Sequence, residues 1–247
     1  MKNSGSPYFS AIVPFYNEEA AAPPLLQELR AVLDGMGQSY EVLCVDDGSG
    51  DGTAAALETA ARLWPQCRVV RFAQNQGQAA GLFWAFQAAQ GQIFMTLDGD
   101  GQNDPTDLPR LVARLAQADY VGGVRAQRQD SPLRRRMSRL ANAVRSRVLG
   151  DGMTDTGCAL KVFRREVREA YLPLRTLYSF MPALAKGAGF VVVEEPVHHR
   201  ARHSGLSKYG LGAMWWRPLV DMAGLWWFLR RRCPSPSRIA LHPGGQP

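Results

Sequence analysis

The stretch Val42-Leu43-Cys44-Val45-Asp46-Asp47-Gly48-Ser49 passes directly from apolar residues into two carboxylates and a glycine. The pattern recurs where Ile93-Phe94-Met95-Thr96-Leu97 runs into Asp98-Gly99-Asp100-Gly101-Gln102. Short apolar runs with β-branched residues, bounded by Gly and Asp, are typical of buried parallel strands. Ligands of open α/β sheets bind outside the carboxyl ends of the strands. We therefore expect both acidic segments to open onto one crevice.

Carboxylates gathered in one crevice repel each other unless a cation lies among them. Oxygen-only ligands suit Mg²⁺ or Mn²⁺, so the two segments predict a divalent metal site. An Asp-Gly pair is also an ordinary turn former, and a single such segment would favour that simpler interpretation. Two of them, each after a buried strand, favour the metal site.

Strand-like and helix-like stretches alternate along the first half of the chain. Strands begin near Phe9, Val42, Val69, Ile93 and Tyr120, and helices are predicted over 23–35, 52–64, 75–90 and 107–117. Repeated βα units predict an α/β fold with a mostly parallel, Rossmann-like sheet that has helices on both faces.

The net charge of +7 is distributed unevenly. Up to Tyr120 there are 7 Lys and Arg against 14 Asp and Glu, a net charge of −7. From Val121 onward there are 22 against 8, a net charge of +14. The acidic half suits a metal, and the basic half suits an anion such as a nucleic acid, a membrane surface or a phosphorylated substrate.

Two amphipathic helices are predicted in the basic half. The helix over 133–149 has apolar residues at helical spacing, six arginines and no acidic residue. It is either a surface helix with a solvated charged face or a contact for an anion.

The second, over 211–229, contains Trp215, Trp216, Trp226 and Trp227 and leads into Arg230-Arg231-Arg232. Arg217 and Asp221 make it a poor membrane span. We interpret it as a helix lying on an anionic bilayer surface. The alternatives are a helix that covers the sheet or one that docks on a membrane-bound partner.

Six motifs together carry a resemblance to a known family. They are PFYNEE (14–19), DDGSGDGT (46–53), NQG (75–77), DGDGQNDP (98–105), DTGC (155–158) and RHSGLSKYG (202–210). Over about residues 8–232 the chain resembles family 2 glycosyltransferases with the GT-A fold. DDGS recurs widely among nucleotide-sugar enzymes, but DxDxQ combined with RxxGxSK points to the branch of dolichol-phosphate mannosyltransferase and bacterial polyprenyl-phosphate glycosyltransferases.

The resemblance implies an inverting hexosyltransferase that moves a sugar from a UDP- or GDP-linked donor to polyprenyl phosphate, for cell-envelope glycan or lipid modification. It implies a nucleotide cradle of Pro14, Tyr16, Glu18, Val45 and Asp47, donor contacts from Asp98 and Gly99, and a metal held by Asp100 and Gln102. It implies phosphate contacts from Arg125, Arg202 and Lys208, and it matches Asp155 to a later acidic position of the catalytic set. Gly99 stands where many relatives have Ala, a difference that we expect to leave its role unchanged.

The acceptor decides whether a general base is needed. A phosphomonoester has a second pKa of about 6, so it is largely dianionic near neutral pH and already nucleophilic. A saccharide or protein hydroxyl acceptor, the alternative, would require a base, for which Asp155 is the visible candidate. The spacing of His198, His199 and His203 does not define a metal cage, and we expect these residues to hydrogen-bond the loop backbone or phosphate. A nucleic-acid-binding protein fits the charge, but no recognition motif supports it.

We expect a catalytic domain over 1–209, a Trp- and Arg-rich membrane-associating segment over 210–232 and a disordered tail over 233–247. The four cysteines lack CxxC spacing and the amino terminus lacks the apolar region of a signal peptide, which favours a cytoplasmic chain. Bacterial members of the branch often continue into membrane-spanning helices. We therefore expect peripheral attachment to the inner face of the membrane, possible help from a membrane-protein partner, and no nucleic-acid ligand.

Overall fold

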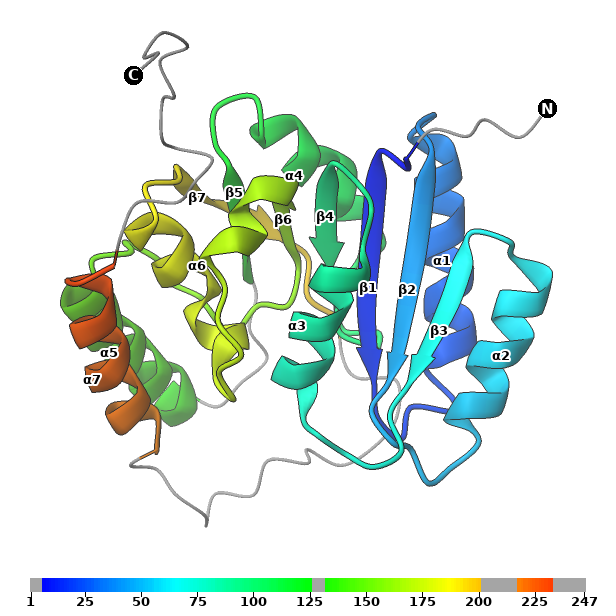
Figure 1. Cartoon of the computed structure of the whole chain (residues 1–247), viewed down its shortest axis with the longest axis horizontal. Coiled ribbons are helices and arrows are strands. Elements are labelled where there is room, and N and C mark those ends of the chain that lie inside the picture. Colours follow the sequence, from blue (N-terminus) through cyan, green and yellow to red (C-terminus); the bar gives the residue numbers. More distant parts are fainter. Residues whose placement is uncertain (1–5, 126–131, 201–216, 233–247) are drawn as a thin grey trace, which may run out of the picture.

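The computed structural model describes residues 6–125, 132–200 and 217–232. Within them, seven strands form one sheet: β1 (Phe9–Phe15), β2 (Tyr40–Asp46), β3 (Cys67–Arg71), β4 (Ile93–Thr96), β5 (Tyr120–Arg125), β6 (Lys161–Arg164) and β7 (Val192–Val197). The spatial order is β3-β2-β1-β4-β6-β5-β7 (Figure 1).

The described helices lie on both faces of the sheet. They are α1 (Ala22–Gly35), α2 (Thr53–Leu63), α3 (Gln78–Ala88), α4 (Leu108–Arg114), α5 (Pro132–Leu149), α6 (Leu177–Gly187) and α7 (Arg217–Leu229). Short 3₁₀ helices cover Pro105–Asp107 and Arg165–Ala170. The predicted mostly parallel α/β fold with helices on both faces is therefore confirmed.

The direction of the strands changes in the second half of the chain. Strands β3, β2, β1 and β4 are mutually parallel, whereas β6 runs antiparallel to both β4 and β5. Strand β7 is parallel to β5. The sequence did not predict β6 and β7, because β6 is four residues long and begins with a lysine, and β7 carries Glu194, Glu195 and Pro196.

Each face of the sheet buries its own apolar core. Leu29 and Leu33 of α1 and Leu111 of α4 pack on one face. Phe86 of α3 and Leu184 of α6 pack on the other, which faces the viewer in Figure 1. Burying a Leu or Phe side chain stabilises a fold by about 1.5–3 kcal/mol, so these cores hold the strand ends in fixed positions.

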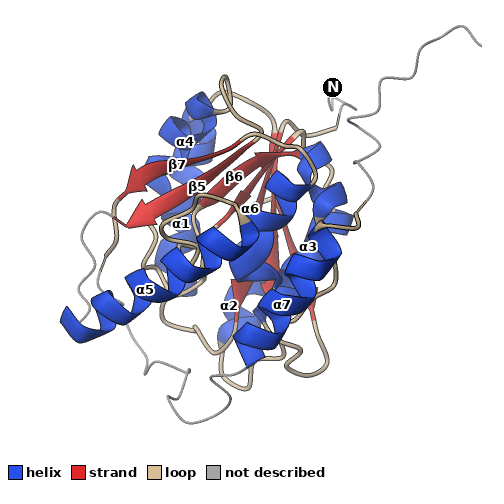
Figure 2. Cartoon of the chain, turned by 90° about the vertical axis from the view of Figure 1, so that its left-hand side faces the viewer, coloured by secondary structure: helices blue, strands red, loops and turns tan. Residues whose placement is uncertain are grey.

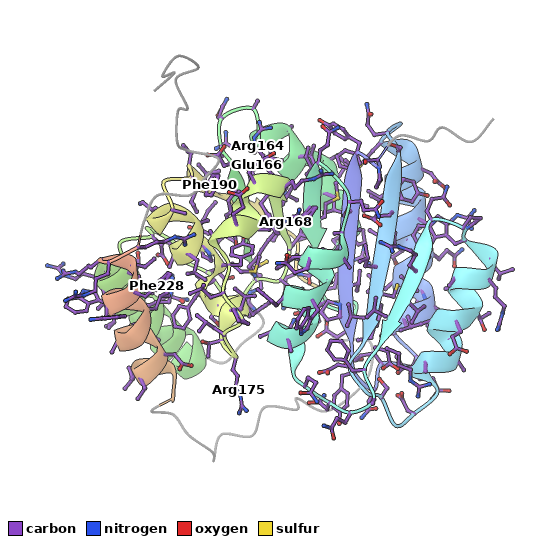
Figure 3. All side chains as sticks on the ribbon, in the orientation of Figure 1. Arg164, Glu166, Arg168, Arg175, Phe190 and Phe228 are labelled. Atoms are coloured by element: carbon purple, nitrogen blue, oxygen red, sulfur yellow. The ribbon has the colours of Figure 1, made fainter. Side chains whose placement is uncertain are left out.

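Helix α7 is attached to the body of the protein by its inner face. It contacts α5 along the side seen in Figure 2. Leu225 is buried with the residues of α3 and α6, and Phe228 packs against the same core (Figure 3). The Arg232 guanidinium donates to the carbonyls of Ala170 (3.0 Å) and Glu169 (3.2 Å). The inner face therefore packs on α5 and on the core shared with α3 and α6, and the interpretation of α7 as a bilayer-surface helix stays a prediction.

The outer face of α7 presents aromatic and aliphatic side chains to solvent. Trp226 is 38% exposed and Trp227 is 56% exposed. The Arg230 guanidinium lies 3.9 Å from the Trp226 ring centroid, and that of Arg231 lies 5.2 Å from the Trp227 centroid. Trp215 and Trp216 lie outside the described residues. Among the described helices, none combines the length and the apolar character needed to cross a bilayer.

Helix α5 uses one of its arginines internally. Arg145 is buried, pairs with Asp151 and donates to the Met153 carbonyl at 3.0 Å. Arg147 is exposed. The expected anionic contact of this helix therefore cannot include all six arginines, and the side chains of the other four lie outside the described part of the chain.

Candidate active site

The carboxyl ends of β1, β2 and β4 border a cavity of about 380 Å³. It is lined by Pro14, Phe15, Tyr16, Glu18, Asp47, Asn75, Gly77, Gln78, Asp98, Gly99 and Asp100. Both acidic segments therefore open onto one crevice, as the pattern of buried strands predicts. Strand β2 follows β1 in register, with Phe15 opposite Asp46, so the two loops that continue from these strands lie side by side.

Asp47 organises the loop that forms one wall of the cavity. Its carboxylate accepts hydrogen bonds from the backbone N–H of Gln76 (2.7 Å) and Gly77 (2.9 Å) and from Asn75 Nδ2 (3.0 Å). Burial raises the pKa of Asp47, and the two backbone hydrogen bonds oppose that rise. Gly48 makes this approach possible: its φ is +69°, and a Cβ there would lie 2.6 Å from the Gln74 carbonyl carbon.

The loop after β1 is joined to the loop after β2. Asn17 has a left-handed φ of +52°, its Oδ1 accepts from the Gly50 N–H (2.8 Å), and its own N–H donates to Ser49 Oγ (3.0 Å). The Glu18 N–H donates to Thr53 Oγ1 (2.8 Å). These bonds hold Tyr16 and Glu18 at the cavity, where Glu18 is buried and Tyr16 is partly exposed.

The carboxylates of Asp98 and Asp100 follow β4 and repel each other. Burial raises the pKa of Asp98 to about 6, with a further contribution from the charge of Asp100. Gln78, the first residue of α3, donates a hydrogen bond to Asp98. Asp100 is 7% exposed and accepts from the Gln102 N–H at 3.1 Å. An arrangement in which burial and a neighbouring charge both disfavour ionisation is one that a bound cation would stabilise.

The donor set fits a divalent metal that is shared with a phosphorylated substrate. Within the described ranges there is no group of three or more His, Cys, Asp or Glu side chains placed to hold a metal. Mg²⁺ is commonly bound by one or two carboxylates together with substrate phosphates. Asp100 offers a buried carboxylate at the cavity wall, and Gln102 follows it on the same loop.

Gly99 is required by its packing. A Cβ at this position would lie 2.4 Å from Phe15 Cδ1 and 2.7 Å from the Pro14 carbonyl oxygen. In this chain a methyl group at position 99 would displace two residues that line the cavity. The expectation that Gly99 keeps the role of the relatives' Ala stays a prediction.

Val45 takes no part in the cavity surface. It is fully buried, and its Cγ1 is the nearest atom, at 3.2 Å, to a Cβ built on Gly81 of α3. The side chain that the resemblance placed in the nucleotide cradle therefore packs between the sheet and α3. Only its backbone lies on the strand that leads to the site.

Arg125 and Asp155 bind each other. Arg125 Nε lies 2.7 Å from one Asp155 carboxylate oxygen and Nη2 lies 2.8 Å from the other, and the Arg125 N–H donates at 3.2 Å. Asp155 is 5% exposed. Neither residue lines the cavity: Arg125 ends β5, and Asp155 lies on the loop before β6.

The segment before the basic RHSGLSKYG motif is attached to the acidic loop. The Arg200 N–H donates to the Gln102 carbonyl (2.9 Å), and its guanidinium pairs with Asp104 (2.8 Å) and Glu28 (2.6 Å). His198 Nδ1 lies 3.0 Å from an Asp107 carboxylate oxygen. Arg202 and Lys208 lie outside the described residues, but the chain leading to them starts beside Asp100 and Gln102.

Sequence reasoning missed two polar residues near the site, Gln78 and Lys161. Gln78 directly follows the NQG motif. Lys161 is 2% exposed and interacts electrostatically with Asp98. A lysine in the apolar run Cys158-Ala159-Leu160-Lys161-Val162-Phe163 was the available signal.

Known proteins resemble this chain in sequence and in fold. A family model described as Glycosyl transferase family 2 matches residues 10–172. Undecaprenyl-phosphate 4-deoxy-4-formamido-L-arabinose transferase of Shewanella sediminis (strain HAW-EB3) is 41% identical over 211 residues, which cover 84% of this chain and 63% of the relative. The protein of the same name from Pseudomonas aeruginosa (strain UCBPP-PA14) is 43% identical over 202 residues, with 81% and 60% covered. The chain thus spans about three fifths of the length of these relatives.

Solved structures share the fold at lower sequence identity. Glucosyl-3-phosphoglycerate synthase from Mycobacterium tuberculosis, in complex with Mn²⁺, UDP-glucose and phosphoglyceric acid, has a TM-score of 0.67 and 18% identity, covering 89% of this chain and 80% of its own. Mannosyltransferase PcManGT from Pyrobaculum calidifontis, in complex with GDP-Man and Mn²⁺, has a TM-score of 0.62 and 22% identity, covering 95% and 67%.

Proposed function

We propose, since this chain belongs to glycosyl transferase family 2, that it transfers a sugar with inversion from a nucleotide sugar to a polyprenyl phosphate. The observation that carries the proposal is the single cavity at the ends of β1, β2 and β4, which gathers Asp47, Asp98 and Asp100 beside Tyr16 and Glu18. Relatives named as undecaprenyl-phosphate transferases support the acceptor class.

On the donor side, the chain's own residues bind and orient. We assign the nucleotide to the wall made by Pro14, Tyr16, Glu18 and Asp47, and the diphosphate to the end with Asp98 and Asp100. Gln78 fixes the Asp98 carboxylate, and Asp100 with Gln102 would hold Mg²⁺ or Mn²⁺. The bound metal would supply Lewis-acid stabilisation of the leaving diphosphate. Mn²⁺ in the two solved structures above supports a divalent cofactor.

On the acceptor side, the ion pair between Arg125 and Asp155 bears on the choice of nucleophile. Both oxygens of Asp155 accept from a guanidinium, so they are engaged and not directed to a hydroxyl proton. The residue that a hydroxyl acceptor would need as a base is therefore poorly placed for that role. A phosphate dianion needs no such base, which favours the lipid phosphate.

We assign the closing of the site to Arg202 and Lys208. The segment 198–200 that precedes them is attached to the loop of Asp100 and Gln102, which supports a short path from these two cations to the diphosphate. Fixed cations strengthen binding where charge develops on phosphate oxygens during transfer.

We further propose that the protein is attached peripherally to the cytoplasmic face of a membrane through α7. Its exposed Trp226 and Trp227 stand beside Arg230 and Arg231, the combination expected of a helix that meets anionic lipid headgroups. The domain scheme is then a catalytic body over 1–209 with a lipid-facing segment over 210–232. A membrane-protein partner could present the acceptor or use the product.

The test uses the full chain with a panel of labelled UDP- and GDP-sugars, Mg²⁺ or Mn²⁺, and undecaprenyl phosphate. We expect label to pass into the organic phase with at least one donor. We also expect Asp100→Asn to reduce transfer about 100-fold or more, from the loss of several kcal/mol of charge stabilisation. Transfer of label only to a saccharide or peptide acceptor would contradict the proposed acceptor. Unchanged turnover and metal dependence in a folded Asp100→Asn would contradict the metal assignment.

A further inference from the structure

Three consecutive carbonyl groups of the loop before β6 accept hydrogen bonds from side chains of three different elements. The Gly157 carbonyl accepts from the Tyr178 hydroxyl of α6 (2.6 Å), and the Cys158 carbonyl accepts from Lys161 Nζ of β6. The Ala159 carbonyl accepts from Thr96 Oγ1 of β4 (2.6 Å). A loop usually directs such carbonyls to water, so this one is held in place from the protein side.

The beginning of the same loop is held by a carboxylate. Glu194 of β7 accepts from the N–H groups of Thr154 (2.6 Å) and Asp155 (3.0 Å) and from the Thr154 hydroxyl (2.8 Å). The backbone N–H groups at the start of the loop thus bond the Glu194 carboxylate. At its end, the carbonyls of Gly157 and Cys158 bond the Tyr178 phenol and the Lys161 ammonium group. Residues 154–159, named the clamped loop here, present Asp155 to Arg125 of β5.

The contact made by Lys161 costs folding free energy, because it buries a charged group. It is 2% exposed, and its burial lowers its pKa to about 8. A hydroxyl or a water molecule could satisfy a carbonyl without burying a charge. Lys161 Nζ also lies 4.0 Å from the centroid of the Tyr178 ring, and its charge interacts with both Asp98 and Asp155. Strand β6, which begins at Lys161, lies between β4, which leads to Asp98, and β5, which ends at Arg125.

We propose that Lys161 and Tyr178 are positioning residues for sugar transfer. They fix the clamped loop, and with it the Arg125–Asp155 pair, relative to Asp98 of the donor site. This inference rests on the proposed function, because the pair matters only if a second substrate approaches Asp98 from that side. Neither residue lines the donor cavity. Displacing reacting groups by about 1 Å can cost about 100-fold in rate while binding is retained.

The test compares Lys161→Met and Tyr178→Phe with Ser10→Ala in the full chain. Ser10 is a matched control, since its buried hydroxyl also bridges a side chain and the backbone, bonding Glu41 (2.7 Å) and the Gly91 N–H (2.7 Å). It lies five residues before the carboxyl end of β1, away from the cavity. We measure kcat for lipid-phosphate transfer, donor affinity by calorimetry with Mn²⁺, and Tm.

We expect kcat to fall roughly 10- to 100-fold in both variants, with donor affinity within about threefold of wild type. Ser10→Ala should lower Tm and leave kcat unchanged. The proposal is overturned if either variant keeps wild-type kcat, or if it loses donor affinity while kcat at saturation stays the same.

Hydrogen exchange separates this proposal from the proposed function. In Tyr178→Phe and Lys161→Met, the amides of Thr154 and Asp155 should exchange faster than in wild type, and in Ser10→Ala they should not. If wild type transfers no sugar to any polyprenyl phosphate, the proposed function fails, and with it the positioning role. If wild type is active but exchange and kcat both match the control, the positioning role alone fails.

Discussion

At the scale of single residues, the cavity keeps carboxylates where folding alone would not favour them. Asp98 is disfavoured as an anion by burial and by Asp100, and Lys161 and Gln78 offset only part of that cost. Such a site loses stability without its cation and recovers it when a cation binds, which is common where function requires unfavourable local charge.

Asp98→Asn should therefore stabilise the metal-free protein at neutral pH. The folded-state pKa of Asp98 is raised to about 6 from 3.8, so the folded state holds this proton more tightly than the unfolded state does. Below pH 4 Asp98 is protonated in both the folded and the unfolded state, so it does not destabilise the fold. As pH rises from 4 through 6 the unfolded state loses this proton first, and stability falls. We expect a gain of about 3 kcal/mol for Asp98→Asn at pH 7, vanishing near pH 4, in denaturant unfolding with chelator.

Asp51→Asn is the control, because the pKa of Asp51 is lowered by folding and the effect of its substitution on stability should have the opposite sign. Although burial works the other way, hydrogen bonds from Thr53 lower the pKa of Asp51. This variant should lose stability as pH rises above 4. A pH-independent effect of Asp98→Asn would show that the charge at this site carries no folding cost.

Gly99→Ala should damage both folding and donor binding. The added methyl group would approach Phe15 and the Pro14 carbonyl to less than 3 Å, and overpacking of this kind costs about 1–3 kcal/mol. Thermal unfolding and nucleotide-sugar calorimetry measure the two effects. Gly50→Ala is the matched control, because a Cβ there meets nothing within 4 Å. Equal Tm and donor affinity for both alanine variants would refute the packing argument.

At the scale of elements, the site is assembled by one segment docking on another. The chain after β7 returns to the acidic loop after β4, where Arg200 pairs with Asp104 and Glu28, and His198 bonds Asp107. Strand β7 is placed for this by its parallel pairing with β5. Residues 198–200, which precede the basic motif in sequence, therefore lie beside the loop of Gln102 and Asp104 because of sheet order, although about a hundred residues separate the two segments.

Arg200→Ala should slow turnover more than it weakens donor binding. The substitution releases residues 198–200, which lead in sequence to Arg202 and Lys208. We expect the charges of these two residues to be needed around the reacting phosphates during transfer. We expect roughly a tenfold fall in kcat in steady-state assays. Arg30→Ala removes an exposed pair with Asp34 and should have little effect. A change in donor KM alone would show that the segment serves binding.

At the scale of the whole molecule, the two halves of the sequence differ in net charge. The carboxylates lie in the first half at the strand ends, and α5 and α7 of the basic half lie together on the opposite side of the molecule from α2 (Figures 1 and 2). Arg145 and Arg232 donate hydrogen bonds inside the protein. The side chains left for a lipid contact at the outer end of α7 are therefore Trp226, Trp227, Arg230 and Arg231.

Trp226→Ser with Trp227→Ser should reduce sedimentation with anionic liposomes at all salt concentrations, because apolar burial is not screened. Arg230→Gln with Arg231→Gln should reduce it mainly at low salt, by about 1 kcal/mol per charge. Trp84→Ser, a 60% exposed tryptophan on α3, is the control and should bind like wild type. If all three bind liposomes equally, α7 is not the lipid contact.

The sequence by itself determined the strands and the acidic loops of the first half. Buried parallel strands such as β1, β2 and β4 must be apolar along their length, so their ends are visible where the carboxylates begin. The fold class and the shared crevice follow from this local pattern, which needs no knowledge of distant contacts.

Only the tertiary structure decided the second half and the inner side of the site. Strand β6 is recognised by its antiparallel pairing with β4 and β5, not by its four residues. The direction in which Val45 faces, the pairing of Arg125 with Asp155 and the clamp of Lys161 and Tyr178 all depend on which elements become neighbours. Partners such as Arg125 and Asp155, 30 residues apart, and Tyr178 and Gly157, 21 residues apart, leave no periodic trace in the sequence. Their contacts are set by sheet order and by the packing of α6 against the sheet.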